Sequence, residues 1–218
     1  MITGNLDTAP MLSGVVLAGG RGSRIGGDKG LADVGGLPMV ALVLRALSEV
    51  TDDIVVAVSG GAGPTYRQAL GQSVRILEDR TPDRGPLEGL SNALRLTRQD
   101  LVVVVPCDVP FLKADILKLL EAKAAGRDAA VPVVSGFLEP LVAVYRKKAG
   151  LRQFRRELDL GTGKVGNAIQ HMDFCRVEEV DLRAVDERLL SFWNVNSKED
   201  LARAGEMARR EVTAPSTA

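Results

Sequence analysis

The chain has 218 residues and a net charge of zero, from 28 basic and 28 acidic side chains. A chain of this length fits one domain and buries roughly 70% of the surface that its unfolded form exposes, so it needs no disulfide or metal for stability. The balanced charge argues against a general binder of nucleic acid or of membrane surfaces, and we expect neither as a partner.

The cytoplasm is the expected location of the protein. The two cysteines, Cys107 and Cys175, lie far apart and form no C-x-x-C pair. The N-terminus lacks a basic segment followed by an apolar core, so no signal peptide is expected. The longest apolar run, Leu101 to Val105, is too short to span a bilayer.

Segments typical of strands and helices alternate along the chain. We expect a disordered leader at 1–10, a single domain at 11–207 and a polar tail at 208–218. The predicted strands are Leu12–Leu17, Ile54–Ser59, Val74–Glu78, Leu101–Pro106, Ala129–Val134, Leu141–Arg146 and Cys175–Val180. The predicted helices are Pro38–Val50, Pro64–Gly71, Leu87–Arg98, Lys113–Ala125, Lys147–Leu158 and Ser197–Arg209.

The strand pattern predicts an α/β fold with a mostly parallel sheet. Several strands are unbroken apolar runs, most clearly Leu101–Val105, as expected for strands buried on both faces. In such sheets ligands bind beyond the carboxyl ends of the strands. The glycine-rich loop, Asp79 and Asp108 each follow a predicted strand, so we expect them to converge on one edge.

The most informative segment is the loop after the first strand, G-G-R-G-S-R-I-G-G-D-K at 19–29. Its glycines can expose backbone N–H groups to an anion, and Arg21, Arg24 and Lys29 add positive charge. Asp28 follows Gly27, so the loop is no Walker A motif, and Ile25 breaks the dinucleotide pattern. A polyphosphate fits it best, the alternative being a surface loop whose glycines only permit tight turns.

Asp108 is the second candidate, because it ends a buried strand and stands near two prolines, Pro106 and Pro110. Prolines restrict the backbone, and a rigid carboxylate suits Mg²⁺. The alternative is that Asp108 caps the following helix.

Three further segments follow predicted strands or precede predicted helices. Asp79 could orient a ribose, a base or a metal-bound water, and Gly85-Pro86 marks a turn with proline at the first helical position, the alternative being an ordinary link. Asn196 offers a carbonyl to Mg²⁺ just before Ser197 and Asp200, which predict a capping box, or it belongs only to that turn. The loop at 159–167 is either an acceptor-side loop or a solvated connector.

Taken in order over residues 12 to about 205, these motifs resemble the MobA family of molybdenum cofactor guanylyltransferases. The residues that carry the resemblance are Leu17-Ala18-Gly19-Gly20 with Ser23, Arg24 and Lys29, Glu78-Asp79, Gly85-Pro86-Leu87 with Gly89, Pro106-Cys107-Asp108 with Pro110, and Asn194-Val195-Asn196. The chain departs from the family pattern at Glu88, where a small residue is more usual, and matches it least well at 135–175.

The resemblance implies a Rossmann-like, three-layer α/β/α fold of the nucleotide-diphospho-sugar transferase type, with about seven strands. It implies transfer of GMP from GTP to the terminal phosphate of molybdopterin, with Mg²⁺ as cofactor and pyrophosphate as product. It also implies transient contact with molybdenum cofactor biosynthesis proteins or apoenzymes. The N-terminal half would bind GTP, and residues 135–175 would form the acceptor side.

The resemblance also assigns roles to residues. Asp108 and Asn196 would hold the metal, and Arg24, Lys29 and Asp108 would be catalytic. The nucleotide would lie on a larger set, namely Leu17, Ala18, Gly19, Gly20, Arg21, Lys29, Asp79, Gly85, Pro86 and Asp108. Sister cytidylyltransferases tend to have Thr-Ala-Ala-Gly and Gly-Gln in the first and third motifs, so Leu17–Gly20 and Gly85-Pro86 favour guanine.

Two other classes of function remain open at this point. Cytidylyl transfer, or nucleotidyl transfer to another phosphate acceptor, would use the same chemistry. A nucleotide-sensing module would bind GTP without turnover. An NAD(P)-dependent oxidoreductase is disfavoured because its glycine fingerprint is absent.

Overall fold

The computed structural model describes residues 12–19, 25–79 and 86–213. Several predictions lie outside the described residues. They are the leader at 1–10, the nucleotide-binding candidates Gly20, Arg21 and Gly85, the catalytic candidate Arg24, and Ser23 of the family motif. The described helices include none long and apolar enough to cross a bilayer.

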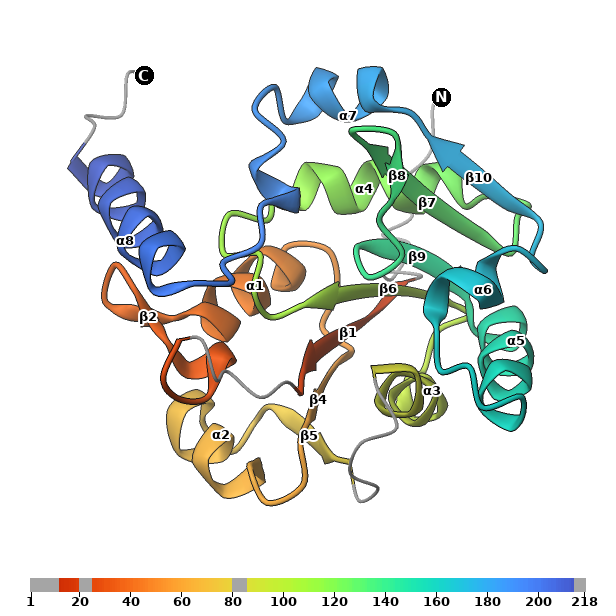
Figure 1. Ribbon diagram of the computed structural model, residues 1–218, viewed down its shortest axis with the longest axis horizontal. Coiled ribbons are helices and arrows are strands. Elements are labelled where there is room, and N and C mark those ends of the chain that lie inside the picture. Colours follow the sequence, from red (N-terminus) through yellow and green to blue (C-terminus); the bar gives the residue numbers. More distant parts are fainter. Residues whose placement is uncertain (1–11, 20–24, 80–85, 214–218) are drawn as a thin grey trace, which may run out of the picture.

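A mixed, mostly parallel sheet forms the centre of the molecule (Figure 1). Its strand order is β10-β7-β9-β6-β1-β4-β5, and β8 pairs with β7 beside this path. Only β9 runs against its two neighbours, β6 and β7, in this path. The bounds are β1 Leu12–Ala18, β4 Ile54–Val58, β5 Arg75–Glu78, β6 Leu101–Pro106, β7 Ala129–Val134, β8 Phe137–Leu138, β9 Ala143–Arg146 and β10 Phe174–Val177. All seven predicted strands are present.

Helices cover both faces of the sheet, which gives the expected three layers. Apolar side chains of α1, α2, α4 and α7 pack on one face, and those of α3, α5 and α6 pack on the other. The bounds are α1 Met39–Ser48, α2 Gly63–Leu70, α3 Pro86–Leu96, α4 Ala114–Lys123, α5 Lys147–Asp159, α6 Val165–Ile169, α7 Glu179–Val185 and α8 Lys198–Thr213.

Side chains of the central strands point alternately to the two faces of the sheet, and this explains why the strand sequences are unbroken apolar runs. Val103 and Val105 of β6 point into the core shared with α1 and α4, whereas Val102 and Val104 point into the core shared with α3 and α5. All four side chains are fully buried. A strand covered by helices on both faces has no solvent side, so every position of β6 favours an apolar residue.

The structure corrects five of the expected details. The last strand ends at Val177 and not at Val180, because α7 begins at Glu179. The helices α6 and α7 and the short hairpin of β2 (Asp33–Val34) and β3 (Leu37–Pro38) were not predicted. The last helix runs to Thr213, past the predicted start of the polar tail at 208.

The helix α8 packs on this hairpin and forms a third, smaller apolar cluster (Figure 1). Val34 and Met39 meet Val195 and Ala204 there, all of them buried. A Cβ on Gly35 would lie only 2.7 Å from the Cβ of Ala208, so the turn and the helix touch. This packing brings the C-terminal part of the chain to the segment that follows the glycine-rich loop.

The buried carboxylate of Asp53 binds several groups at the opposite edge of the sheet, where the parallel strands begin. Asp53 is 2% exposed and accepts hydrogen bonds from the Ser13 hydroxyl and the Arg98 backbone, and it pairs with Arg75. Burial alone would raise the pKa of Asp53, but these hydrogen bonds and the charge of Arg75 together hold it below the usual value.

Replacing Asp53 by asparagine should lower the free energy of unfolding by about 3 kcal/mol, because it leaves buried donors and Arg75 without their charged partner. The native state binds the Asp53 proton less tightly than the unfolded state, so its contribution is present above about pH 4 and is lost as the pH falls below that. Urea unfolding at pH 7 and at pH 3 tests this. An equal loss of stability on acidification in the wild type and in Asp53→Asn would contradict it.

Candidate active site

The described ends of the glycine-rich loop are joined by one buried tyrosine. The Tyr66 hydroxyl of α2 donates a hydrogen bond to the Asp28 carboxylate at 2.6 Å and lies 3.2 Å from the Ala18 carbonyl oxygen at the end of β1. The same carboxylate accepts a hydrogen bond from the backbone N–H of Gly30 at 3.1 Å. Burial and the hydrogen bond to Asp28 raise the pKa of Tyr66, so its hydroxyl keeps its proton.

Gly30 has no room for a side chain at this junction. A Cβ at Gly30 would lie 2.4 Å from the Tyr66 hydroxyl oxygen and 3.2 Å from the Cys107 sulfur. Asp28, Gly30 and Tyr66 were not predicted, because nothing in the motif indicates that a helix supplies a tyrosine 38 residues after Asp28.

Gly30→Ala should therefore displace the Tyr66 hydroxyl and weaken nucleotide binding by about tenfold, since a small displacement in a site is costly. Titration with GTP measures this. Tyr66→Phe removes the hydroxyl that the new methyl group at position 30 would meet. The double variant Gly30→Ala/Tyr66→Phe should therefore bind GTP more tightly than the sum of the two single losses of binding free energy predicts. Strict additivity would show that the close contact has no role in shaping the loop.

Asp108 lies just beyond the carboxyl end of β6, as predicted. The Cys107 N–H donates to the Leu17 carbonyl at 3.0 Å, and the Asp108 carbonyl accepts from the Val195 N–H at 2.9 Å. The alternative that Asp108 caps a helix is wrong, because α4 begins at Ala114, six residues after Asp108, and its N-cap residue is Lys113. Burial and then the charge of Asp108 raise the pKa of the Cys107 thiol to about 12, so this thiol is no nucleophile at neutral pH.

Lys29 connects three segments that are far apart in the sequence. Its ammonium group forms an ion pair with the Asp108 carboxylate through Oδ2 and donates a hydrogen bond to Oδ1 of Asn196 at 2.6 Å. The side chains of Lys29 and Asp108 are 19% and 15% exposed. The other carboxylate oxygen, Asp108 Oδ1, is buried, and no described residue donates a hydrogen bond to it.

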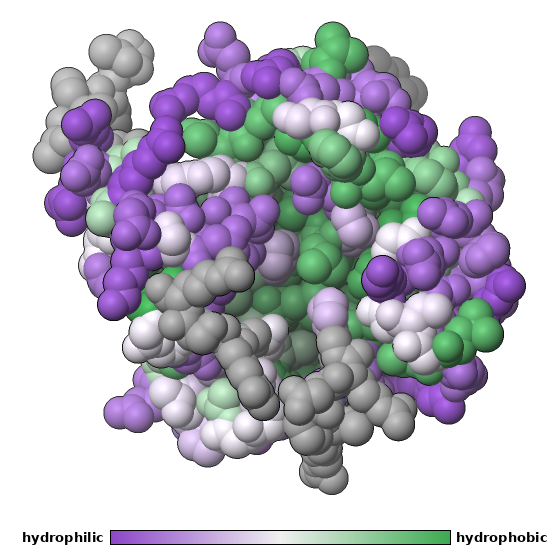
Figure 2. Space-filling model, in the orientation of Figure 1, coloured by the Kyte–Doolittle hydropathy of each residue, from purple (hydrophilic) through white to green (hydrophobic). Residues whose placement is uncertain are grey.

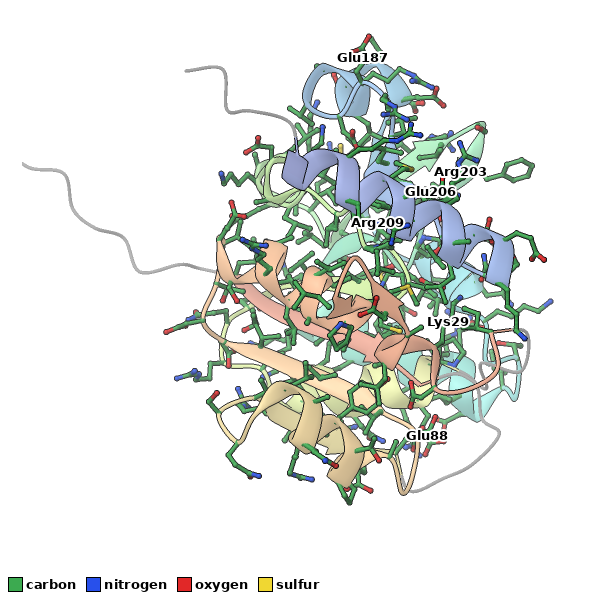
Figure 3. The ribbon with its side chains drawn as sticks, turned by 90° about the vertical axis from the view of Figure 1, so that its left-hand side faces the viewer. Lys29, Glu88, Glu187, Arg203, Glu206 and Arg209 are labelled. Atoms are coloured by element: carbon green, nitrogen blue, oxygen red, sulfur yellow. The ribbon has the colours of Figure 1, made fainter. Side chains whose placement is uncertain are left out.

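Asn196 is held in place by the predicted capping box. The Asp200 carboxylate accepts hydrogen bonds from the backbone N–H groups of Asn196 and Ser197, and the Ser197 hydroxyl accepts one from Asp200, all at 3.0 Å. The turn uses the Asn196 backbone, whereas its side chain reaches Lys29. Figure 3 shows Lys29 on the same side of the molecule as α8.

Aromatic contacts fix the segment before α8. Trp193 stacks on Phe111 with the ring centroids 5.9 Å apart, and the Arg203 guanidinium lies 5.2 Å from the centre of the Trp193 ring. At the start of α8, Lys198 reaches the glycine-rich loop: its Nζ lies 4.0 Å from the position of a Cβ on Gly26. Lys198 was not among the predicted site residues.

The remaining candidates border the same edge of the sheet. Leu17 and Ala18 bury their side chains in the two main cores, so only their backbones face the loop, and Gly19 is exposed. The Asp79 N–H pairs with the Val58 carbonyl at 2.8 Å, which places Asp79 directly after β5.

The first turns of α3 face Asp79. Pro86 is the first residue of α3, as predicted, and a Cβ on Gly89 would lie 3.8 Å from an Asp79 carboxylate oxygen. Figure 2 shows a hollow near the middle of the viewed face, beside the carboxyl end of β6 in Figure 1, with a mostly hydrophobic floor. The described candidates thus lie along the edge that the topology predicts.

The described residues contain no group of three or more histidine, cysteine, aspartate or glutamate side chains that could hold a metal. A divalent cation bound here would need ligands beyond the carboxylate of Asp108. The amide oxygen of Asn196 is one, and phosphates and waters are the others that Mg²⁺ usually takes.

A family model for the MobA-like NTP transferase domain matches residues 14–172. The chain belongs to the MobA-like NTP transferase family. Membership of this family makes the protein a nucleotidyltransferase, and its motifs and three-layer fold agree with that assignment.

Relatives in the MobA-like family carry more specific names. A molybdenum cofactor guanylyltransferase of Desulfosudis oleivorans is 31% identical over 195 residues, which are 88% of this chain and 94% of the relative. A protein of Natronomonas pharaonis named as a probable molybdenum cofactor guanylyltransferase is 34% identical over 196 residues, 89% of this chain and 96% of the relative.

A solved structure is similar throughout. The molybdopterin-guanine dinucleotide biosynthesis protein A of Archaeoglobus fulgidus matches 91% of this chain and 99% of its own, with a TM-score of 0.77 and 28% identity.

Proposed function

We propose that this protein transfers GMP from GTP to the terminal phosphate of molybdopterin, with Mg²⁺ as cofactor, and releases pyrophosphate. The relatives named as molybdenum cofactor guanylyltransferases support the substrates. The observation that carries the proposal is the meeting of Lys29, Asp108 and Asn196 at the end of the glycine-rich loop.

The donor set fits Mg²⁺. Asp108 and Asn196 offer hard oxygen ligands, and the buried Asp108 Oδ1 has no hydrogen-bond donor among the described residues. Asp108 and Asn196 would hold the ion. When bound, Mg²⁺ polarises the phosphoryl oxygens and neutralises charge that develops during transfer.

The residues of the chain supply positioning and charge. The acceptor is a phosphate monoester with a second pKa of about 6, so it is mostly dianionic near neutral pH and needs no general base. An acceptor oxygen forms a bond to the α-phosphorus of GTP, and the bond from that phosphorus to the β-bridging oxygen breaks. Lys29 stabilises the negative charge that moves to the departing pyrophosphate.

Guanine selection is proposed for the region of Asp79 and α3. Asp79 lies against the first turns of this helix, where a carboxylate can accept hydrogen bonds from the N–H groups of a guanine edge. The motifs Leu17-Ala18-Gly19-Gly20 and Gly85-Pro86 favour guanine over cytosine within the family pattern.

Incubation of the full chain with Mg²⁺, molybdopterin and either GTP, CTP or ATP tests the proposal. Mass spectrometry should detect the guanine dinucleotide with GTP and much less product with the other nucleotides. Product formed mainly from CTP would change the proposed base, whereas binding of GTP without any product would favour a sensing module.

A further inference from the structure

We propose that Lys29 acts as a stand-in for the metal ion: in the nucleotide-free protein its ammonium occupies the cation position between Asp108 and Asn196, and a divalent cation binds well only after Lys29 moves onto the triphosphate. This inference rests on the proposed function. It predicts that nucleotide binding and metal binding favour each other.

The contacts of Lys29 carry the inference. The ammonium touches Asp108 Oδ2 and Asn196 Oδ1, which belong to the two residues expected to hold the metal. One small region therefore already holds one positive charge between its oxygen donors. A divalent cation that approaches Asp108 meets both the repulsion of this charge and the loss of an ion pair.

The surroundings of Lys29 offer it another partner when a nucleotide binds. Lys29 is the last residue of the glycine-rich loop, and beyond the chain neighbours of Gly27 no described atom lies within 4 Å of the position of a Cβ on this glycine, so there is open space beside Gly27. A triphosphate on this loop presents several negative charges to a long, flexible lysine side chain. Movement of Lys29 onto the phosphates would release the Asp108 and Asn196 oxygens together.

The two binding events are then linked. A nucleotide that removes Lys29 from Asp108 raises the affinity for the cation, and by reciprocity the cation raises the affinity for the nucleotide. Lysine is suited to this exchange because its ammonium is a compact point charge, as a metal ion is.

Titration of the nucleotide-free full chain with Mn²⁺, followed by electron paramagnetic resonance and calorimetry, tests the inference. Lys29→Met should bind Mn²⁺ about tenfold more tightly than the wild type, a gain within the usual range for coupled sites. Lys29→Gln keeps an N–H donor without the charge and should show a similar gain. In the double variant Lys29→Met/Asp108→Asn the gain should disappear.

Lys198→Met is the charge-matched control. Lys198 is exposed, its ammonium lies close to Gly26, and no carboxylate among the described residues pairs with it. Its removal deletes the same charge from the same region without freeing Asp108, so Mn²⁺ affinity should change less than about twofold.

The inference is overturned if the wild type binds Mn²⁺ as tightly as Lys29→Met, if Lys198→Met gains as much, or if neither Lys29 variant binds Mn²⁺. Thermal unfolding of each variant verifies that it is folded. No nucleotide is present in these titrations, so their outcome is separate from that of the proposed function, which fails if the wild type neither binds GTP nor forms the dinucleotide.

Discussion

Replacing Asp108 by asparagine is expected to slow nucleotidyl transfer by about a thousandfold, because metal stabilisation of transition-state charge is worth several kcal/mol and each 1.36 kcal/mol is tenfold in rate. The asparagine keeps the size of the side chain but loses the charge that would hold the metal. The measurement is the rate of pyrophosphate release with saturating GTP, Mg²⁺ and molybdopterin.

Asp115→Asn provides the matched control for this prediction. Asp115 is an exposed aspartate on α4 that pairs with Lys118, so the same chemical change there should leave the transfer rate nearly unchanged. Urea unfolding should show both variants folded. Transfer by Asp108→Asn at a rate near that of the wild type would remove Asp108 from the metal site.

The second large effect is expected for Lys29→Met, which should reduce kcat/KM for GTP by about a hundredfold, as the loss of one group that stabilises transition-state charge usually does. Lys118→Met, at an exposed lysine of α4 outside the acceptor-side segment, is the control and should retain full activity. The Lys29 variant should transfer GMP poorly while it binds Mn²⁺ more tightly than the wild type. Unchanged kinetics would exclude Lys29 from the phosphate site.

The strands were predictable because a strand buried on both faces has apolar residues at successive positions. The run Leu101–Val105 has no polar position, and the structure sends its alternate side chains into two separate cores. The prediction failed where elements are short. The helix α7 has only 7 residues, too few for a helical period to appear. Its first two residues, Glu179 and Val180, were therefore assigned to a longer final strand.

Only those residues of the candidate site that directly follow a strand could be placed from the sequence. The order of the strands places Asp79 and Asp108 at one edge, as the sequence analysis expected. The pairing of Lys29 with Asp108 depends on tertiary packing across 79 residues, and no local pattern encodes it. The link from Tyr66 to Asp28 was missed for the same reason, because a tyrosine on a short helix reads as an ordinary core residue.

The hydrogen bond between Lys29 and Asn196 spans 167 positions of the chain. A polypeptide still emerging from the ribosome can therefore carry the glycine-rich loop and Asp108 long before it can carry a finished site. Any product of premature termination before residue 196 would lack the amide that steadies Lys29, together with the helix that packs on the β2–β3 hairpin. With the roles proposed for Lys29 and Asn196, transfer activity requires the chain to be synthesised at least as far as Asn196.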